Sequence, residues 1–466
     1  MLFFSYMFPS FIFLVSFIER ISSDGIECPC QQKCGQVTGQ LTDHGTKKEV
    51  MIIGDSDNDV NTVGMWKWQS FSHLLDTNPE IDINSTSVMC TTHQKNKKYG
   101  FYVDFPTTYD EKSSELSEFV TKIQNRAARH YADFVAVDML QLLGPCNFTT
   151  DHITNIIKVT NNTFPKIKNI SNLVVYCVLP WKPPCIKSDC QLTPYLSNLC
   201  DAMILSPDSY FDYCDDSCIA KATVQASKIY FGVTEYEAYG FQGLNILMGI
   251  PWYGYNYTCE QYANASAHPM CKLKTKQVTQ ADNTTHTVCD IAGSRTKFRL
   301  GGINGIQDMV LETKNYSLSD QTPYHVYNVT PEGSNDLKFQ MAWFENIGSL
   351  WFKYDLVRKL QLRGTVIYTG DDLTYTSTGE DSGGFDGKMW SWIHHYLFST
   401  SDGSEVSKEK NLAGMMAGIG IGLFVLGCVL GLILACIALR KTKKPLRVPF
   451  SSDPVVEDYY DEDNRL

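Results

Sequence analysis

The sequence has no CxxC pair and no cluster of histidines, so the ligand spacing of a protein zinc site is absent. It also lacks an excess of basic residues, since the formal net charge is −11 over 466 residues. This charge argues against a nucleic-acid-binding protein. No internal repeat is visible, and neither a metal nor a cofactor is expected. The hydrophobic content of 43% is ample for one large domain with a core or for two modest ones.

Long uncharged apolar segments occur at the two ends. Met1–Ile18 carries no charge and is followed by small polar residues, which predicts a signal peptide over residues 1–23, cleaved near Ser23–Gly25. The segment lacks the usual basic residue before its apolar part, so an uncleaved anchor is the alternative. Leu412–Leu439 is uncharged and exceeds the roughly 20 residues that cross a bilayer.

Basic residues follow this second segment directly (Arg440, Lys441, Lys443 and Lys444). The positive-inside rule then places residues 440–466 in the cytosol. The sequence thus predicts a single-pass type I membrane protein with a lumenal or extracellular ectodomain, joined to its span by a linker at residues 401–411. A lysosomal and a cell-surface location both fit. Within the span, Gly414, Gly418 and Gly422 form consecutive GxxxG steps, which favour a homodimer through the membrane, although many glycine-rich spans do not dimerise.

Fourteen of the sixteen cysteines lie before the predicted span, which indicates disulfides in an oxidising compartment. Cys185 with Cys190, and Cys259 with either Cys271 or Cys289, are plausible pairs, but spacing does not fix the connectivity. Nine N-glycosylation sequons agree with a lumenal glycoprotein: Asn84, Asn147, Asn161, Asn169, Asn256, Asn264, Asn283, Asn315 and Asn328.

Short apolar runs alternate with helical patterns between the two ends. This alternation predicts a parallel sheet covered by helices, and eight units over about 350 residues favour a (β/α)₈ TIM barrel, with an open flavodoxin-like sheet as the alternative. Residues 255–338 lack a long helix and predict an insertion between strand seven and its helix. The predicted strands are Glu49–Gly54, Tyr99–Phe105, Asp133–Leu140, Leu173–Leu179, Ala202–Leu205, Asn245–Pro251, Gly364–Tyr368 and, more weakly, Ile81–Asn84. The predicted helices are Glu111–Tyr131, Lys221–Phe241 and Ile347–Leu362.

The stretch ADFVAVDML at Ala132–Leu140 is the most informative strand. Because side chains alternate between the two faces of a strand, Phe134, Ala136, Asp138 and Leu140 share one face. That face is expected to line the barrel interior and end at its mouth, where it carries one carboxylate between two alkyl side chains.

Several fragments resemble the chitobiase-like members of glycoside hydrolase family 18. The most specific is NILMGIPWYGYNYTC at Asn245–Cys259. The supporting fragments, in the same order as in the family, are CPCQQKC at Cys28–Cys34, CDIAGSRTKF at Cys289–Phe298, FQMAWFEN at Phe339–Asn346 and the pair Arg363–Gly364. The resemblance implies a TIM barrel over residues 28–400 and retaining hydrolysis of N-acetylglucosamine linkages, in which the substrate's own acetamide attacks the anomeric carbon.

The family motif DGxDxDxE implies a role for each position of the fourth strand. Asp133 matches the first Asp, while Phe134 replaces Gly and Ala136 replaces the middle acidic residue. Asp138 matches the Asp that orients the acetamide, and Leu140 replaces the Glu that protonates the glycosidic oxygen. A general acid contributes about 10²–10⁴-fold in rate, so the motif implies a pseudoenzyme.

The resemblance also suggests sugar-binding residues beyond this strand. Tyr368 stands where the family has a Trp floor beneath the sugar, and Asp208 matches an Asp near the mouth. Trp252 is a candidate sugar platform, although large aromatic residues at barrel ends are as often packing residues. Tyr253 fits the rim or the wall of the insertion and is a candidate substrate-binding residue there.

Three interpretations remain open from the sequence. The first is a membrane-anchored glycosidase-like barrel that binds N-acetylglucosamine-containing (chitin-type) oligosaccharides but hydrolyses them poorly. The second is an active glycosidase in oligosaccharide catabolism whose acid is Asp208 or a loop carboxylate of the insertion. The third is a non-catalytic adhesion or interaction ectodomain in which the barrel is a glycosylated spacer.

Overall fold

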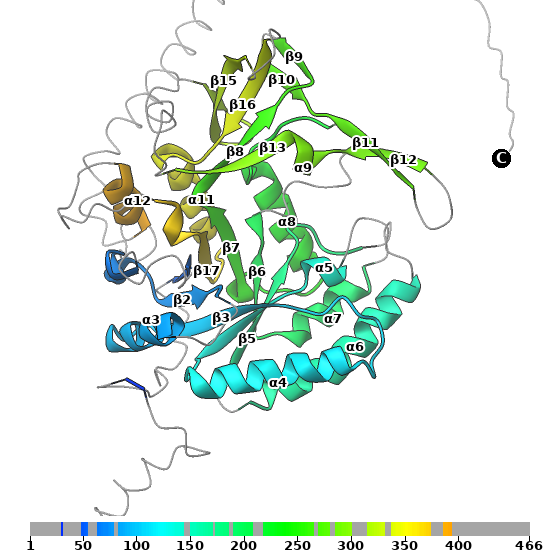
Figure 1. Ribbon diagram of the computed structural model, residues 1–466, viewed down its shortest axis with the longest axis vertical. Helices are drawn as coiled ribbons and strands as arrows, with labels where there is room; N and C mark the ends of the chain where they lie inside the picture. The colour runs from blue at the N-terminus through cyan, green and yellow to red at the C-terminus, as the bar shows by residue number, and fades with distance from the viewer. Residues whose placement is uncertain are drawn as a thin grey trace, which may run out of the picture. The chain divides into compact units, whose positions relative to one another are not determined.

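Eight parallel strands form a closed barrel, which confirms the predicted fold class (Figure 1). The computed structural model describes residues 29–30, 48–54, 63–78, 83–143, 150–170, 173–185, 190–207, 218–264, 269–279, 285–300, 315–330, 337–373 and 385–393. These residues all lie in one compact unit, residues 1–400. The predicted signal peptide, linker, membrane span and tail fall outside the described residues, as does Asp208. Over the described ranges no helix has both the length and the apolar character that crossing a bilayer requires.

The barrel strands follow one another in chain order, with β17 closing the ring between β7 and β1. They are β1 (Glu49–Gly54), β2 (His73–Asp76), β3 (Lys98–Asp104), β4 (Phe134–Asp138), β5 (Val174–Leu179), β6 (Ala202–Leu205), β7 (Ile246–Pro251) and β17 (Gly364–Tyr368). The helices are α3 (Ile83–Gln94), α4 (Ser114–Arg129), α5 (Leu140–Leu143), α6 (Thr150–Lys168), α7 (Leu192–Leu199), α8 (Ala226–Ala238), α11 (Ile347–Lys359) and α12 (Phe385–Ile393), with 3₁₀ turns η3 (Trp68–Ser70), η5 (Gly243–Asn245) and η6 (Gly370–Asp372).

Seven of the predicted strands match barrel strands to within a few residues, but the prediction of a strand at Ile81–Asn84 is wrong. The second strand is His73–Asp76, and Ile83 begins helix α3. The first and last residues of β2, His73 and Asp76, are polar, so a search for runs of apolar residues does not detect this strand. Its ends are nevertheless buried because they are bonded: Ser72 Oγ lies 2.8 Å from His73 Nδ1, and the hydroxyl of Tyr99 donates to Asp76 at 2.8 Å.

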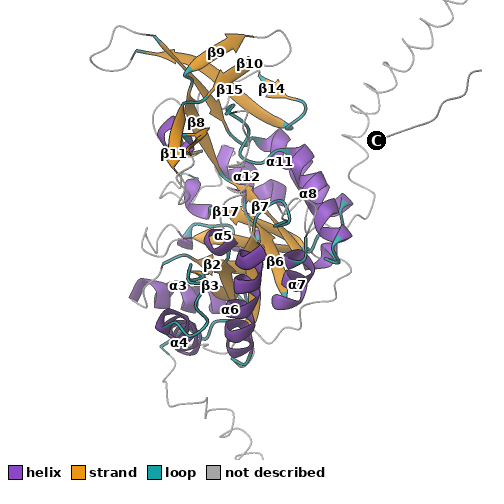
Figure 2. Cartoon of the chain, turned by 90° about the vertical axis from the view of Figure 1, so that its right-hand side faces the viewer, coloured by secondary structure: helices purple, strands orange, loops and turns teal. Residues whose placement is uncertain are grey.

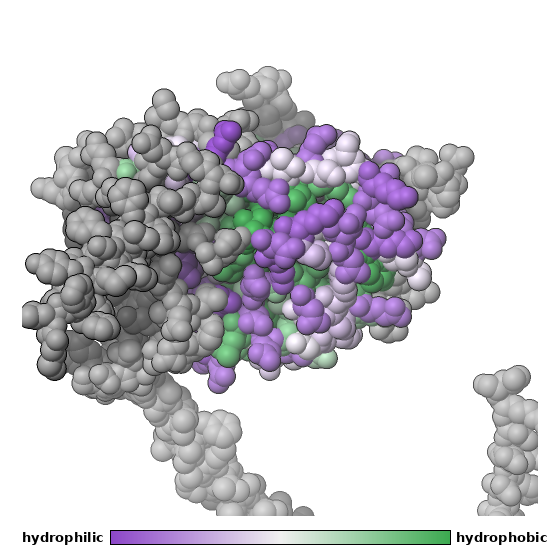
Figure 3. All heavy atoms as spheres, turned by 90° about the horizontal axis from the view of Figure 1, so that it is seen from below, coloured by the Kyte–Doolittle hydropathy of each residue, from purple (hydrophilic) through white to green (hydrophobic). Residues whose placement is uncertain are grey.

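The strands are apolar on both faces because one face fills the barrel and the other packs under the helices. The inward side chains form one buried group, hereafter the interior cluster (Met51, Ile53, Leu75, Phe134, Ala136, Tyr176, Val178, Ala202, Ile204, Leu247 and Val366). The helices turn their apolar sides to the strands and their polar sides to solvent, as α4 does with Phe119 and Ile123 buried. Hydrophilic side chains accordingly cover most of the described surface seen from below (Figure 3).

A partly buried ion pair lies at the amino-terminal end of the barrel. The Arg363 guanidinium donates to both carboxylate oxygens of Glu49 at 2.8 and 3.0 Å, and the Tyr176 hydroxyl donates to the same carboxylate at 3.2 Å. Gly364 follows, and a Cβ there would lie 1.8 Å from the Glu49 carbonyl oxygen. The pair Arg363–Gly364 is therefore explained by the closure of β17 against β1.

An insertion between β7 and α11 forms a separate group of strands at one end of the barrel (Figures 1 and 2). Its five-stranded sheet has the order β13 (Arg295–Arg299), β8 (Tyr253–Thr258), β16 (Lys338–Trp343), β15 (Thr322–Val329), β14 (Tyr316–Ser317). Two hairpins and a short helix complete it: β9 (Gln261–Asn264) with β10 (Pro269–Lys272), β11 (Thr275–Thr279) with β12 (Thr285–Cys289), and α9 (Ile291–Ser294). The insertion starts directly at the carboxyl end of β7, so it adjoins the catalytic mouth of a TIM barrel.

Five disulfides are formed among the described residues. Cys185–Cys190 and Cys259–Cys271 are as predicted, whereas the alternative partner for Cys259 is wrong because Cys289 is bonded to Cys218. The last bond ties the insertion to the segment after β6. The other two bonds are Cys30–Cys90 and Cys177–Cys200.

Candidate active site

The site is built at the carboxyl end of β4. Phe134 and Ala136 belong to the interior cluster, and Leu140 packs against it, which confirms that these positions share the inward face. Asp138 is the last residue of β4, and Leu140 is the first residue of α5. The polypeptide therefore turns from strand to helix directly over the carboxylate.

The Asp138 carboxylate is held through both of its oxygens. The backbone N–H of Leu140 donates to Oδ1 at 2.7 Å, and the Tyr102 hydroxyl donates to Oδ2 in a short hydrogen bond. The residue is only 9% exposed. These two bonds fix the orientation of the carboxylate group.

Tyr102 is a site residue that the sequence did not reveal. It lies on β3, two residues after Gly100, where a Cβ would lie 2.4 Å from the Phe134 ring. Burial, then the neighbouring Tyr368 and Asp138, raise the pKa of the Tyr102 hydroxyl far above its usual value. The hydroxyl thus stays protonated as a hydrogen-bond donor and is a poor replacement for the missing acid.

A second carboxylate, also absent from the sequence prediction, stands beside Asp138. Asp104 ends β3 and is the register partner of Asp138 across the β3–β4 ladder. It lies two residues after the inward-facing Tyr102, so it shares that face, and it is exposed. The acid position, Leu140, follows Asp138 by two residues and is already in α5.

Tyr368 is the last residue of β17, at the carboxyl end of the barrel strands. It packs both against the interior cluster and against the aromatic residues of the insertion, hereafter the insertion cluster (Tyr253, Tyr255, Tyr257, Met341 and Trp343, with the surrounding cysteines). Its peptide bond to Thr369 is cis. Its backbone carbonyl accepts a hydrogen bond from the backbone N–H of Trp252 at 2.6 Å. Tyr368 therefore connects the barrel interior to the insertion.

The structure does not bring Trp252 into this site. Its side chain is 0% exposed, lies on the helix-facing side of the strands and packs edge-to-face on Trp390 with ring centroids 5.0 Å apart. Tyr253 is also buried, at 1% exposure, and packs on Tyr255 inside the insertion cluster. Both residues have packing roles here, because the transition from β7 to β8 fixes their directions.

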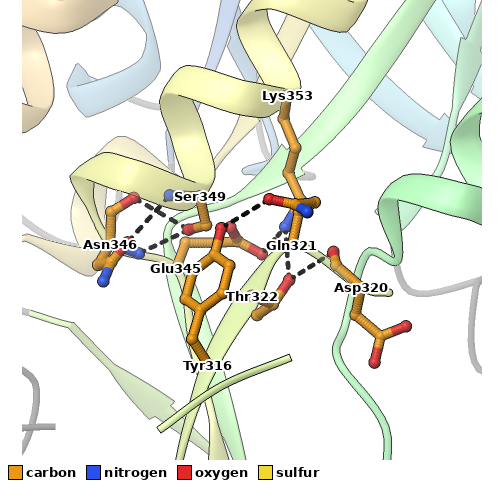
Figure 4. Close-up of polar contacts among 8 residues, drawn as sticks. All are labelled: Tyr316, Asp320, Gln321, Thr322, Glu345, Asn346, Ser349 and Lys353. Atoms are coloured by element: carbon orange, nitrogen blue, oxygen red, sulfur yellow. Dashed lines mark hydrogen bonds and ion pairs between the residues drawn. The ribbon is translucent and has the colours of Figure 1, made fainter. Parts of the chain in front are cut away.

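Glu345, the carboxylate that follows β16, is excluded as a substitute acid by its surroundings (Figure 4). Its side chain is buried and bonded to the ammonium of Lys353, which also donates to the Thr322 hydroxyl at 3.0 Å. Burial raises the pKa of Glu345 and lowers the pKa of Lys353. The adjoining capping box of Asn346 and Ser349 starts α11, so this cluster joins the insertion to a barrel helix.

No group of three or more histidine, cysteine or acidic side chains suited to a metal ion occurs among the residues that the structure describes.

No protein-family profile matches the chain. The chain is 22% identical to mouse (Mus musculus) di-N-acetylchitobiase over 372 residues, which cover 78% of this chain and 92% of the relative. It is 22% identical to the human (Homo sapiens) protein of the same name, covering 76% and 84%. It is also 23% identical to a probable di-N-acetylchitobiase 2 of Dictyostelium discoideum, covering 62% and 73%.

Solved structures share the fold at low sequence identity. The YKL-39 structures, solved in the presence of chitooligosaccharides (GlcNAc4), match with a TM-score of 0.53 and 14% identity over 76% of this chain and 100% of YKL-39. A group IV chitinase of Ostrinia furnacalis in complex with allosamidin matches with a TM-score of 0.51 and 13% identity, covering 75% and 98%.

The closed barrel of this chain shares its fold with the solved chitinase and with YKL-39. The similarity to the di-N-acetylchitobiases extends over about three quarters of the chain. The similarity to the chitobiase-like family 18 proteins that the sequence fragments predict is thus confirmed.

Proposed function

We propose that this chain binds N-acetylglucosamine-containing, chitin-type oligosaccharides at the barrel mouth and hydrolyses them poorly or not at all. The observation that carries the proposal is the end of β4, where an oriented Asp138 is followed by a hydrocarbon side chain, Leu140, at the position of the acid. Similarity to di-N-acetylchitobiases and the chitooligosaccharide used with YKL-39 support the class of ligand.

Each retained residue has a part in binding. Asp138 accepts the N–H of the sugar's acetamide, and Tyr102 keeps the carboxylate in the orientation needed for this. Tyr368 offers its ring to the sugar from the end of β17. A hydrogen bond to a charged group contributes about 1.5–3 kcal/mol, and stacking on an aromatic ring adds about 0.5–1.5 kcal/mol. Together these terms suit a weak to moderate sugar-binding site.

The loss of hydrolysis follows from proton chemistry. The departing sugar oxygen must be protonated as the glycosidic bond breaks, and Leu140 has no proton to give. The missing general acid costs about 10²–10⁴-fold in rate. Tyr102 does not replace it because its pKa is raised, and Glu345 does not because it is buried in an ion pair.

The test combines binding and turnover on the full-length chain. Calorimetric titration with N-acetylglucosamine tetramer should give saturable binding that Asp138→Ala abolishes. A fluorogenic chitobioside should be cleaved at background rate by the natural chain and faster by Leu140→Glu, with Leu140→Gln as the isosteric control without an acidic proton. Absence of saturable binding would refute the glycan-binding role, and steady turnover by the natural chain would refute the impairment.

A second candidate function, an active glycosidase, is favoured by Asp104. This exposed carboxylate lies on the neighbouring strand level with Asp138, so it is the described carboxylate best placed to supply a proton from another direction. If the natural chain releases N-acetylglucosamine, Asp104→Asn should remove that activity while tetramer binding persists. Activity that persists in Asp104→Asn but is lost in Asp208→Asn would assign the role of the general acid to Asp208.

We further propose a type I membrane protein anchored by residues 412–439, with its barrel in the lysosome or outside the cell. The uncharged span and the basic residues after it support this orientation. Cleavage of the tail, but not the barrel, by protease added to the cytosolic side of sealed vesicles tests it. Disulfide trapping within the span, with Gly418→Leu as the variant that separates the helices, tests the homodimer.

A further inference from the structure

Three cations stand in one row on the edge strand of the insertion. Arg295, Lys297 and Arg299 occupy alternate positions of β13, so their side chains share one face of the sheet. β13 pairs only with β8 in the five-stranded sheet, and the side chains of Lys297 and Arg299 are 46% and 60% exposed. These three residues are hereafter the basic row.

Two cations of the basic row lie over the rings of tyrosines on β8. Arg295 is the register partner of Tyr257, yet its guanidinium lies 4.1 Å from the ring centroid of Tyr255. Lys297 is the partner of Tyr255, yet its ammonium lies 3.9 Å from the ring centroid of Tyr253. The cationic groups of Arg295 and Lys297 are thus each displaced toward the mouth, over the next tyrosine of β8, and cation–π contacts stabilise this arrangement.

The row ends beside the candidate sugar site. Lys297 Nζ lies 3.4 Å from one carboxylate oxygen of Asp372, and Arg299 Nε lies 3.9 Å from the other. The same carboxylate accepts hydrogen bonds from the backbone N–H and the hydroxyl of Thr369 at 3.1 and 3.0 Å. Thr369 directly follows Tyr368, so the cations are fixed to the turn that carries the aromatic floor.

Cationic side chains outnumber anionic ones among the described residues of the first half of the insertion, up to residue 300. The chain has a net charge of −11. In the described residues 253–264, 269–279 and 285–300, six side chains are cationic and two are anionic: Lys272, Lys274, Lys276, Arg295, Lys297 and Arg299 against Glu260 and Asp290. Asp371 and Asp372 in η6 balance at most two of the three cations of the row.

We propose that the basic row is an anion-binding subsite continuous with the mouth. Its ligand class is an N-acetylglucosamine oligosaccharide that carries a carboxylate or a sulfate. The neutral sugar lies over Tyr368 near Asp138, where a negative charge would be repelled, and the charged unit lies outward against Lys297 and Arg299. This inference rests on the proposed glycan binding and names the chemistry of the natural ligand.

The experiment compares three probes on one backbone: chitotetraose, 6-O-sulfated chitotetraose and chitotetraose oxidised to carboxylates at C6. Calorimetric titration of the full-length chain at low salt should show each anionic probe binding about tenfold tighter than the neutral one, as expected for exposed charges a few ångströms apart. The preference should fall to about twofold at 0.5 M salt because mobile ions screen it. The sulfate and carboxylate arms show which anion the row prefers.

Variants separate this inference from the proposed function. Arg299→Gln and Lys297→Gln should each reduce the anionic preference several-fold and leave chitotetraose affinity unchanged, whereas Lys297→Arg should retain it. Lys276→Gln is the matched control, since Lys276 is an exposed insertion cation that pairs with Asp290. Equal affinity for all three probes, or a preference that survives both glutamine variants, would overturn the subsite. A row that binds anionic lipid vesicles without discriminating the probes would also overturn it, and loss of chitotetraose binding in the natural chain would instead refute the proposed function.

Discussion

Acidification should destabilise the barrel through one histidine. His73 is buried on β2 near the barrel floor, with its ring edge-on to Phe134 and Tyr176 at centroid distances of 5.4 and 6.4 Å. Nδ1 lies 2.8 Å from the Ser72 hydroxyl, and Nε2 has no hydrogen-bond partner among the described residues. Burial lowers the pKa of His73 to about 4, against a contribution in the other direction from Glu49.

The direction and the magnitude of this effect on the free energy of unfolding follow from proton linkage. Between pH 6.5 and 4 the unfolded chain protonates this histidine and the folded chain does not, so the free energy of unfolding falls as the pH falls through that window. Above pH 6.5 the effect is absent. A shift from 6.5 to about 4 corresponds to about 3 kcal/mol in full, and to about 2 kcal/mol at pH 5.

Urea denaturation followed by tryptophan fluorescence at pH 7.5, 6 and 5 measures this effect. His73→Gln keeps a polar group for Ser72 but does not titrate, so its stability relative to the natural chain should rise by about 2 kcal/mol between pH 7.5 and pH 5. Ser72→Ala keeps the titrating ring and should retain the natural pH dependence. Parallel curves for His73→Gln and the natural chain would refute the assignment of the pH dependence to His73.

Three further outcomes follow from other contacts. Lys353→Met should lower the free energy of unfolding by about 3–5 kcal/mol, because it leaves Glu345 buried without its cation. Since burial raises the pKa of Glu345, this loss of stability should shrink as the pH falls. An equal loss at all pH values in urea titrations would contradict this. Tyr102→Phe should weaken chitotetraose binding about tenfold by removing a donor to the Asp138 carboxylate, and an unchanged dissociation constant would contradict it. Gly364→Ala should lower the thermal midpoint sharply, since its Cβ would lie 1.8 Å from a carbonyl oxygen of β1, whereas the control Gly64→Ala meets nothing within 4 Å.

The strand that carries the site could be predicted because its signal is local. The period of two along Ala132–Leu140 fixes which side chains face inward whatever the rest of the fold does. Asp138 and Leu140 are found where that pattern puts them. Tyr102 and Asp104 could not be found in the same way, because their neighbourhood with Asp138 exists only through the pairing of β3 with β4.

The wrong predictions and the missed features concern residues whose side-chain direction or role is not set by the alternation of side chains along a strand. Trp252 lies between β7 and β8, where the chain leaves the barrel for the insertion, and this change of direction turns its ring toward Trp390. The missed strand β2 has only four residues, two of them polar, and its stability comes from partners on other elements. The basic row was overlooked because Arg295, Lys297 and Arg299 form a common exposed pattern whose meaning depends on Asp372, far along the chain.

Loss of the acid is compatible with retained binding because the two depend on different states of the substrate. An acid that protonates the leaving oxygen acts on the transition state, so its removal lowers the rate and not the affinity for the intact sugar. In the proposed binding mode Asp138 and Tyr368 contact the sugar in its ground state. The hydrogen bond from position 140 to Asp138 requires only the backbone N–H of Leu140 and not its side chain. A barrel of this kind can therefore keep its ligand, and extend its recognition to the insertion, after the bond-breaking step has been lost.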